Sequence, residues 1–387
     1  MPRLLESFFV RLAIDVTACW RPQRVGMTTV AIELSKAIVA RKAKDEITLL
    51  CSRERPAALE GLDCEAVLSP YRHELAQKVR WLRRVESRLE CDAILYPYWP
   101  SPPFRRHDAP PAAVFVHDLA FRQRPQEVPW QQRLYMGTVL GPSLRNAAAV
   151  LVPSESTRRD LVDLYKVSDL ISKVEVIPEG LPPQVPAGPL PEGLEPGFIL
   201  AVGTVEPRKN YVRLLAAFRQ LRGRGALPFI INGRPGVPQL VIAGRPGWAY
   251  GDTLQRIAAE PGVRYLGHVD EPTLAALYES ASVLAFPSLY EGFGLPLLEA
   301  MAHGVPAVVG AVGALPELAG EATIMVKPED VDAIAGGLER LLSDAKLREK
   351  MGQEGKRRAA TFTWDRAAEQ TLAILRRIGS PTQRKVA

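Results

Sequence analysis

The stretch SVLAFPSLYEGFGLPLLEAMAHG, residues 282–304, decides the fold class of this chain of 387 residues. Its opening, SVLAFPS, is a short apolar run that is typical of a buried strand, and LPLLEAMAHG has the pattern of a helix that ends at a glycine. The loop between them contains Gly292 and Gly294, which let the backbone approach a ligand closely. A strand, a loop and a helix in this order predict one unit of a doubly wound parallel sheet.

Similar apolar runs alternate with helical patterns along the whole chain. They are RLAIDV, EITLLC, DAILYP, AVFVHDL and AVLVPS in the first half, and GFILAVG, QLVIAG, VRYLG, SVLAFPS and PAVVG in the second. Runs of this length between helices are typical of buried parallel strands. Two sets of them predict an α/β protein with two doubly wound, Rossmann-like domains, which suits a chain longer than one hydrophobic core usually supports.

A stretch rich in proline and glycine, VIPEGLPPQVPAGPLPEGLEPG at residues 176–197, separates the two sets and predicts a semi-rigid linker. We therefore expect an N-terminal domain over 1–185 and a C-terminal domain over 186–365. The last segment, 366–387, begins with helical periodicity and is expected to pack back across the domains.

A short repeat lies in the second half of the chain. GRPG occurs at 233–236 and again at 244–247, each time behind an apolar stretch. Only one copy can occupy the loop after a central strand. We expect the second copy there, because QLVIAG is the better run for a buried strand, and we expect the first copy to be an inserted loop.

The composition narrows the class of protein. The net charge of +6 favours an anionic partner, but the basic residues are dispersed rather than interleaved with aromatic residues as in a nucleic-acid-binding face. The four cysteines show neither a CxxC pair nor a Cys/His ligand spacing, so they suggest no zinc site and no disulfide framework. Charges interrupt the N-terminal segment where a signal peptide would be apolar, and no window has the length of a membrane span. We expect a cytoplasmic protein.

Two glutamates flank the glycine loop, Glu291 before it and Glu299 on the helix. In a doubly wound domain, ligands bind where strands end and the next helices begin, so both carboxylates are expected to face one pocket. The N–H groups at the helix start, near Gly294 and Leu295, suit a phosphate or a developing negative charge. A purely structural interpretation, with glutamates on a solvated helix start, explains Glu291 alone but not the whole segment.

A second cluster of polar residues follows the strand GFILAV in VGTVEPRKN, residues 202–210. Arg208 and Lys209 are adjacent cations at the end of that strand, where they could neutralise a diphosphate. The alternative is a solvated pair of charges at a helix start. Cations at that position are electrostatically unfavourable unless an anion lies nearby.

The segment FPSLYEGFGLPLLEAMAHGVP, with two glutamates separated by seven residues, resembles the retaining glycosyltransferases of family 4, which have the GT-B fold. Further similar segments are VIAGRPGW, YLGHVDEPTLAALY, VGALPELAGEA, VFVHDLAF and VLVPSESTRRDL, so the resemblance covers most of the chain. It implies two Rossmann-like domains whose parallel sheets face an interdomain cleft, with an acceptor-side N-terminal domain and a C-terminal domain that binds a nucleotide diphosphate sugar.

The resemblance also implies roles for individual residues. Arg208 and Lys209 would hold the donor pyrophosphate, Glu291 the hydroxyls of the donor sugar, and Glu299 the ribose hydroxyls, and neither glutamate role requires a raised pKa. The expected catalytic residues are His117, Glu291, Arg208 and Lys209. The expected donor-binding residues are Gly26, Thr204, Arg208, Lys209, Arg245, Val269, Glu291, Phe293, Gly294, Leu295 and Glu299.

Two of these residues lie in the first half of the chain. His117 ends the strand AVFV, and the resemblance places such a histidine near the transferred sugar; a satisfied structural histidine at a strand end is the alternative. Gly26 opens a helix after the first strand. Members of the family commonly have two or three glycines in that loop, and this chain has only one there, so Gly26 could equally be an ordinary helix-start residue.

The resemblance implies front-face transfer with retention of anomeric configuration, in which the departing diphosphate oxygen accepts the acceptor's proton. We expect no metal and no cofactor, since the nucleotide sugar is a substrate. The Asp330-Val331-Asp332 motif has the form that binds a divalent cation, but its place before a helical pattern favours helix-start acids.

The donor and acceptor remain open at this point. The segment SLYEGFGLP resembles bacterial mannosyl- and rhamnosyltransferases of surface-polysaccharide biosynthesis, so GDP-mannose is expected first, with UDP-, ADP- and dTDP-sugars as alternatives. A GT-B phosphorylase or epimerase and a noncatalytic sugar-nucleotide-binding subunit are the competing functions. The presence of both glutamates favours catalysis over the noncatalytic subunit.

The acceptor side offers one further pattern, YRHELAQKVRWLRRVESRLE at residues 71–90. Its apolar residues recur at helical spacing, its other positions are rich in arginine, and Trp81 could lie at a polar–apolar boundary. Such a helix could rest on an anionic inner membrane and bring the protein to a lipid-linked acceptor. The alternative is an ordinary amphipathic helix packed on its own domain.

Overall fold

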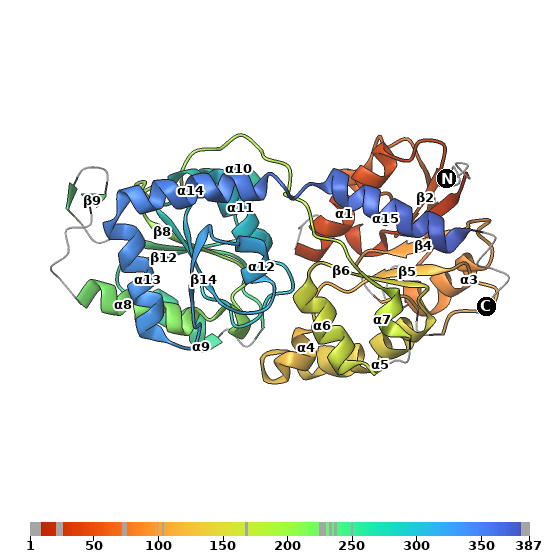
Figure 1. The fold of residues 1–387 in the computed structure, drawn as a ribbon, viewed down its shortest axis with the longest axis horizontal. Coiled ribbons are helices and arrows are strands. Elements are labelled where there is room, and N and C mark those ends of the chain that lie inside the picture. Colours follow the sequence, from red (N-terminus) through yellow and green to blue (C-terminus); the bar gives the residue numbers. More distant parts are fainter. Residues whose placement is uncertain are drawn as a thin grey trace, which may run out of the picture. The chain divides into compact units, whose positions relative to one another are not determined.

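The computed structural model describes residues 9–20, 26–71, 76–98, 100–102, 104–166, 169–223, 230–231, 234–235, 238–248 and 251–380. Within them the chain forms two compact units (Figure 1). Unit 1 takes the described residues up to Arg122, Gln131–Gly180, and those from Thr363 onward. Unit 2 takes Gln123–Trp130 and Leu181–Phe362.

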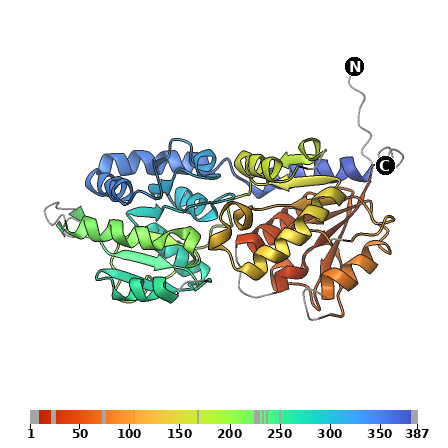
Figure 2. The ribbon, with the colours of Figure 1, turned by 90° about the horizontal axis from the view of Figure 1, so that it is seen from below.

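Unit 1 is built on a parallel sheet with the strand order β3-β2-β1-β4-β5-β6-β7. The strands are β1 (Arg11–Asp15), β2 (Glu46–Cys51), β3 (Glu65–Leu68), β4 (Ala93–Tyr96), β5 (Ala112–Phe115), β6 (Ala149–Val152) and β7 (Val174–Val176). The helices include α1 (Gly26–Ala40), α3 (Arg83–Glu86), α4 (Ala120–Gln123), α5 (Trp130–Asn146), α6 (Glu155–Leu164), α7 (Leu170–Lys173) and α15 (Trp364–Gly379). Seen from below, the yellow helix α5 lies over the strands of this sheet (Figure 2).

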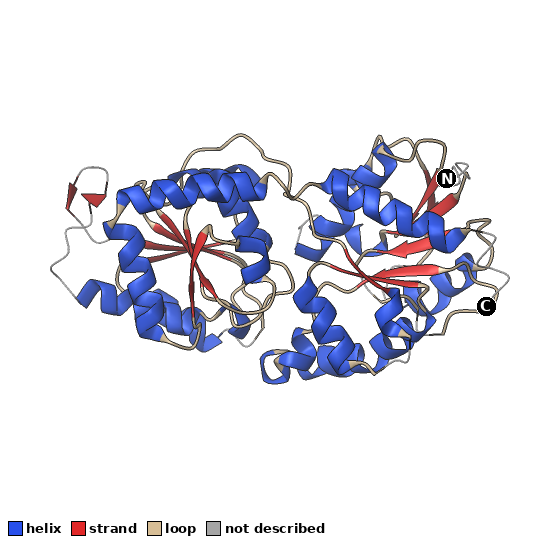
Figure 3. Ribbon diagram, in the orientation of Figure 1, coloured by secondary structure: helices blue, strands red, loops and turns tan. Residues whose placement is uncertain are grey.

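Unit 2 is built on a second parallel sheet with the order β12-β11-β8-β13-β14-β15. The strands are β8 (Ile199–Val202), β11 (Leu240–Ala243), β12 (Val263–Gly267), β13 (Val283–Phe286), β14 (Ala307–Gly310) and β15 (Thr323–Val326). The helices are α8 (Tyr211–Gly223), α9 (Gly251–Ala259), α10 (Glu271–Ser280), α11 (Leu295–His303), α12 (Leu315–Ala319), α13 (Val331–Ser343) and α14 (Ala345–Ala359). Helices flank both faces of the sheet in each unit (Figure 3).

The alternation of side chains along each strand builds a separate core on each face of the sheet in unit 2. On β8, Leu200 joins the core under α10, α11 and α12, whereas Ile199 and Ala201 join the core under α8, α9 and α13. Because both faces are covered, the strands are apolar at consecutive positions, as the sequence predicted.

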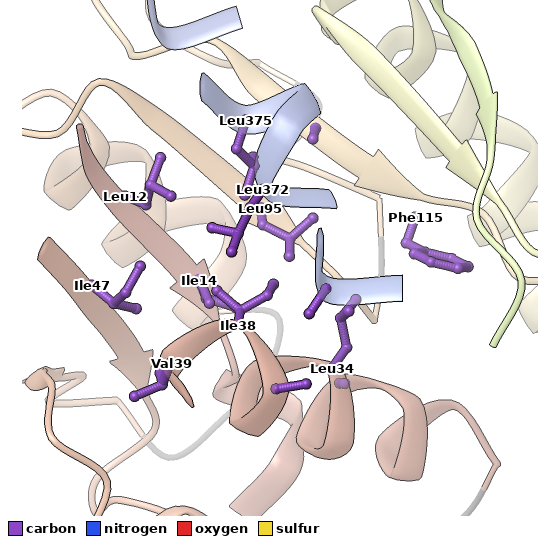
Figure 4. Packing of buried hydrophobic residues seen from close by; sticks show 14 of the residues in the cluster. Leu12, Ile14, Leu34, Ile38, Val39, Ile47, Leu95, Phe115, Leu372 and Leu375 are labelled. Carbon is purple, nitrogen blue, oxygen red and sulfur yellow. The ribbon is translucent and has the colours of Figure 1, made fainter. Parts of the chain in front are cut away.

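The C-terminal helix α15 completes the core of unit 1. Leu372 and Leu375 pack with Leu12 and Leu95 of the central strands and with Ile38 of α1 (Figure 4). The helix begins at a capped position, since the Thr363 side chain accepts from Arg366 N at 3.2 Å. The last described helix is thus integral to the unit that contains the first strand.

The repeated GRPG segments differ as expected. The second copy directly follows β11, a central strand of unit 2. The described part of the first copy, Arg234–Pro235, forms strand β10, which pairs only with β9 (Ile230–Ile231) in a separate two-stranded sheet. The prediction that the second copy occupies the loop of the main sheet is confirmed.

Candidate functional site

The strand order of unit 2 places one crevice at a defined point. The chain builds outward from β8 in one direction through β11 and β12, and in the other through β13, β14 and β15. Loops that leave neighbouring strands on either side of this switch diverge, which creates a ligand crevice at the carboxyl ends of β8 and β13. Those two strand ends carry the segments 203–210 and 287–294, the two segments that the sequence singled out.

The loop after β13 depends on a glycine at its end. Gly294 has φ +113° and caps the N-terminus of α11, and a Cβ atom there would lie 2.8 Å from Leu315 Cδ2. Any other residue would therefore have a strained backbone there and would push the Leu315 side chain aside. Phe293 is buried in the core, edge-on to Phe362, and Leu295 is the first residue of α11.

The Glu291 carboxylate is bound by two cations from the other loop. Lys209 Nζ lies 2.6 Å from Glu291 Oε1, and Arg208 Nη1 lies 2.6 Å from Glu291 Oε2. Arg208 also donates to the Tyr290 carbonyl oxygen at 2.9 Å. The structure therefore brings together three of the four expected catalytic residues, from segments more than 80 positions apart in the sequence.

Burial and charge act on Glu291 in opposite directions. Burial alone would raise the pKa of this carboxyl, but Arg208 and Lys209 outweigh burial and lower the pKa to about 2. Glu291 is 6% exposed, so its pairs with the cations are poorly screened by solvent. Glu291 is thus an anion at neutral pH and holds the two cations at the end of the strands.

Two residues that the sequence analysis did not assign complete this cluster. Glu206, which is buried, pairs with Arg208 at 2.7 Å, so that Arg208 lies between two carboxylates. Asn210 has φ +62° and donates from Nδ2 to the carbonyl oxygens of Pro287 and Pro328, at 2.9 and 2.6 Å. These bonds fix the Arg208–Lys209 turn against the loop after β13. An asparagine directly after the two cations, a residue type that tolerates positive φ, was the available signal.

Glu299 belongs to a different network. The Tyr278 hydroxyl donates to Glu299 Oε2 at 2.9 Å, and the Tyr278 ring stacks on His303 with a centroid separation of 5.4 Å. Burial raises the pKa of Glu299 to about 7, because the single hydrogen bond from Tyr278 offsets burial only in part. In the described part of the chain, no hydrogen bond or ion pair joins Glu299 to Glu291. Nothing in the sequence pattern linked Tyr278 to Glu299.

The loops after β8 and β11 approach each other through their backbones. A Cβ atom on Gly244 would lie 1.9 Å from the Gly203 carbonyl oxygen, so a glycine is required at this contact. Val205 N donates to the Arg245 carbonyl oxygen at 2.8 Å, which places Thr204 and Arg245 on adjoining loops. Val269 follows β12, the next strand of the sheet, and packs partly buried against the core.

The first-half residues lie in unit 1. His117 Nε2 lies 2.7 Å from the Pro97 carbonyl oxygen and Nδ1 lies 3.2 Å from Glu179 Oε1, while the ring stacks on Phe115. Both ring nitrogens are therefore engaged by protein groups. Gly26 is the first residue of α1, and most of the loop before it, 21–25, lies outside the described residues.

The aspartate motif has a local structural role. Asp330 is the N-cap of α13, and its side chain accepts from Ala333 N at 3.0 Å. Asp332 lies in the first turn of the same helix, where an acidic side chain complements the helix dipole. The expectation of helix-start acids is confirmed.

The sequence matches two family models that together span most of the chain. Residues 25–185 match the model described as Glycosyltransferase Family 4, and residues 189–358 match the model of glycosyl transferases group 1. The O-antigen chain mannosyltransferase B of Escherichia coli is 34% identical over 270 residues, which cover 67% of this chain and 69% of that protein. The MMP alpha-(1->4)-mannosyltransferase of Mycolicibacterium hassiacum is 32% identical over 283 residues, which cover 68% of this chain and 64% of the relative.

Solved structures share the fold over nearly the whole chain. Sucrose-phosphate synthase from Thermosynechococcus elongatus has a TM-score of 0.72 at 21% identity, with 95% of this chain and 99% of that chain covered. WaaG, a glycosyltransferase involved in lipopolysaccharide biosynthesis, has a TM-score of 0.67 at 15% identity, with 94% and 99% covered. Two doubly wound, Rossmann-like units with this strand order constitute the GT-B fold. The chain belongs to the group 1, family 4 glycosyltransferases.

Proposed function

We propose that this protein is a retaining, metal-independent glycosyltransferase that moves a hexose from a nucleotide diphosphate sugar to a glycan or lipid-linked acceptor. The observation that carries the proposal is the cluster of Arg208, Lys209 and Glu291 at the switch point of unit 2. GDP-mannose is the first donor to test, because mannosyltransferases are among the relatives that match two thirds of the chain.

The cluster suits the charge changes of the transfer. The bond between the anomeric carbon and the diphosphate oxygen breaks, the acceptor oxygen bonds to that carbon on the same face, and the acceptor's proton passes to the departing diphosphate. Negative charge develops on the diphosphate, where Arg208 and Lys209 would stabilise it. Glu291 would then exchange its ion pairs for hydrogen bonds from the sugar hydroxyls, and Glu299 would accept from the ribose hydroxyls.

His117 is the residue of unit 1 that we propose to contact the transferred sugar. Its ring already contacts the Pro97 carbonyl oxygen and Glu179, so its orientation is fixed before any sugar binds. A preset imidazole costs little conformational entropy when it contacts a ligand. We assign His117 to the transferred sugar and not to proton transfer, because the departing diphosphate takes the acceptor's proton.

Two alternative functions predict different results when candidate donors are tested for binding and turnover. A UDP-, ADP- or dTDP-sugar could replace GDP-mannose, and Anabaena HepE, a structural neighbour at 16% identity, was solved with UDP and glucose. A noncatalytic sugar-nucleotide-binding subunit would bind a donor without turnover. The presence of both Glu291 and Glu299 favours an enzyme, because a subunit that only binds the donor could lose one of them.

A thermal-shift screen with GDP-mannose and with UDP-, ADP- and dTDP-sugars identifies the donor class. A ligand that binds only the native state stabilises it by about 2.7 kcal/mol at 100 times its Kd, which raises Tm by several degrees. We expect this rise with GDP-mannose in the wild type and in Arg256→Ala, a control whose surface arginine pairs only with Asp252 among the described contacts. We expect its loss in Lys209→Ala. The same shift in Lys209→Ala as in the wild type would remove the proposed site.

The acceptor side includes a basic surface in unit 1. In the expected helix 71–90, the structure has a π-helical turn over Gln77–Leu82 followed by α3 (Arg83–Glu86), and residues 72–75 lie outside the described residues. Trp81 and Leu82 are buried, not at a boundary, whereas Arg80, Arg83 and Arg84 are exposed. In the described residues no helix combines the length and apolarity of a membrane span. We propose that these exposed arginines contact an anionic membrane surface that carries the acceptor.

A further inference from the structure

The segment Gln123–Trp130 belongs to unit 2, although the residues before and after it belong to unit 1. It comprises the end of α4, a short 3-10 turn over Pro125–Glu127, and the first residue of α5. The sequence pattern gave no function to this segment. Its contacts in unit 2 are made with the loops that carry the donor-site residues.

Arg124 contacts the loop that carries Glu291. Its Nη2 donates to the Leu289 carbonyl oxygen at 3.1 Å, two residues before Glu291, and also lies 3.4 Å from Glu329 Oε1. Leu289 N in turn donates to the Arg208 carbonyl oxygen at 2.8 Å. Both polar groups of the Leu289 backbone therefore form hydrogen bonds, the carbonyl oxygen with Arg124 and the N–H group with the Arg208–Lys209 turn.

Glu127 contacts the loop that carries Arg245. Its carbonyl oxygen accepts from Trp248 Nε1 at 2.6 Å, at the end of the GRPGW segment. Its carboxylate lies 3.5 Å from Arg124 Nη1. Burial raises the pKa of Glu127, whereas the charges of Arg124, Arg208 and Arg213 act to lower it. Because Arg208 acts on this carboxylate, Glu127 lies within electrostatic range of the Arg208–Lys209 turn.

We infer that Gln123–Trp130 forms an additional wall of the donor site and that Arg124 is a positioning residue, which holds the Leu289–Glu291 backbone in register with the Arg208–Lys209 turn. The inference rests on the proposed function for its effect on donor binding. It does not rest on that function for the contact itself. Arg124 is 26% exposed and its pair with Glu329 is partly solvated, so the geometry of the Leu289 bond, not the ion pair, carries the effect.

Hydrogen exchange tests the contact without any ligand. In Arg124→Ala, backbone amides in peptides that contain Leu289–Glu291 and Arg208–Asn210 should exchange faster, because the loop loses a hydrogen bond that restrains it. Arg124→Lys, which retains a donor for the Leu289 carbonyl, should restore part of the protection. Gln126→Ala, an exposed neighbour on the same segment, is the matched control. Wild-type exchange in Arg124→Ala would overturn the inference, whatever the protein binds.

Kinetics then separate positioning from a general loss of fold. We expect Arg124→Ala to raise the donor KM about fivefold with kcat within about twofold, the size of one lost hydrogen bond in a binding loop. Arg124→Lys should recover most of that KM. Faster exchange with an unchanged donor KM would overturn the positioning role of Arg124, whereas the proposed site itself is tested separately by Lys209→Ala. A parallel fall in kcat and in folded protein would identify a purely structural role and would also contradict the inference.

Discussion

Glu291 and Glu299 lie in one short segment of the sequence, yet the structure gives their carboxyls opposite environments. Two cations lower the pKa of Glu291 to about 2, whereas Glu299, with one hydrogen bond from Tyr278, has its pKa raised to about 7. The two carboxyls therefore respond differently to pH. Glu291 is charged at every physiological pH, and Glu299 changes its charge within the physiological range.

Nucleotide affinity should therefore depend on the ionisation of Glu299. If ribose hydroxyls donate to its carboxylate, only the ionised form binds well, and affinity should weaken about tenfold for each pH unit below about 7. Calorimetric titration of the nucleoside diphosphate between pH 6 and pH 8 measures this slope. The slope should vanish in Glu299→Gln. A wild-type slope that persists in that variant would assign the titration to another group.

The ionisation of Glu299 also makes the stability of unit 2 depend on pH. The pKa of Glu299 rises on folding from about 4.5 to about 7, so its contribution is fully present below pH 4.5 and is lost as the pH rises through 7. Glu291 acts in the opposite sense, since its lowered pKa contributes stability that is lost as the pH falls from 4.5 toward 2.

At the scale of elements, the sequence analysis identified the central strands of both main sheets and the edge strand β12, but not the edge strands β3, β7 and β15. The strand β13 is buried at every position and reads as an apolar run, whereas β3 is largely exposed and contains a glutamate and no long apolar run. The three-residue β7 is partly exposed as well. An edge strand is defined by its pairing with a neighbour, which local hydrophobic periodicity does not encode.

The helix expected over 71–90 shows the same limit. Spacing predicted its apolar face, and Leu82 on that face is buried in the protein. Spacing did not predict that Glu86 is fully buried, where it accepts from Arg105 Nε at 2.8 Å and contacts the Tyr96 hydroxyl. Both partners of Glu86 come from segments that follow later in the chain.

The exposed arginines of this element make the membrane proposal testable. We expect the protein to cosediment with anionic liposomes at low ionic strength and to dissociate as salt rises, because each basic residue near such a surface contributes about 1 kcal/mol. Arg80, Arg83 and Arg84 replaced together by Ser should weaken binding by up to about a hundredfold if each contact forms. Zwitterionic liposomes serve as the control. Absence of cosedimentation at low salt would favour a soluble acceptor.

At the scale of the molecule, the fold was accessible from sequence because two sets of apolar runs encode two covered parallel sheets. The sequence did not predict the pairing of Arg208 and Lys209 with Glu291; the topology explains it, since β8 and β13 are neighbours at the switch point of the sheet. The sequence did not reveal that Gln123–Trp130 joins unit 2, nor that Tyr278 binds Glu299. Those contacts depend on tertiary packing between segments with no shared pattern.

The central claim is that the Arg208–Lys209–Glu291 cluster performs glycosyl transfer without a metal. The most direct measurement is the release of the nucleoside diphosphate from GDP-mannose and from the other donors in excess EDTA. Both transfer to an acceptor and hydrolysis of the donor release this product. We predict release from one donor by the wild type and by Arg256→Ala, and a loss of about a hundredfold or more in Lys209→Ala and Glu291→Gln. Wild-type rates in both site variants, or an absolute requirement for added Mg²⁺ or Mn²⁺, would contradict the account.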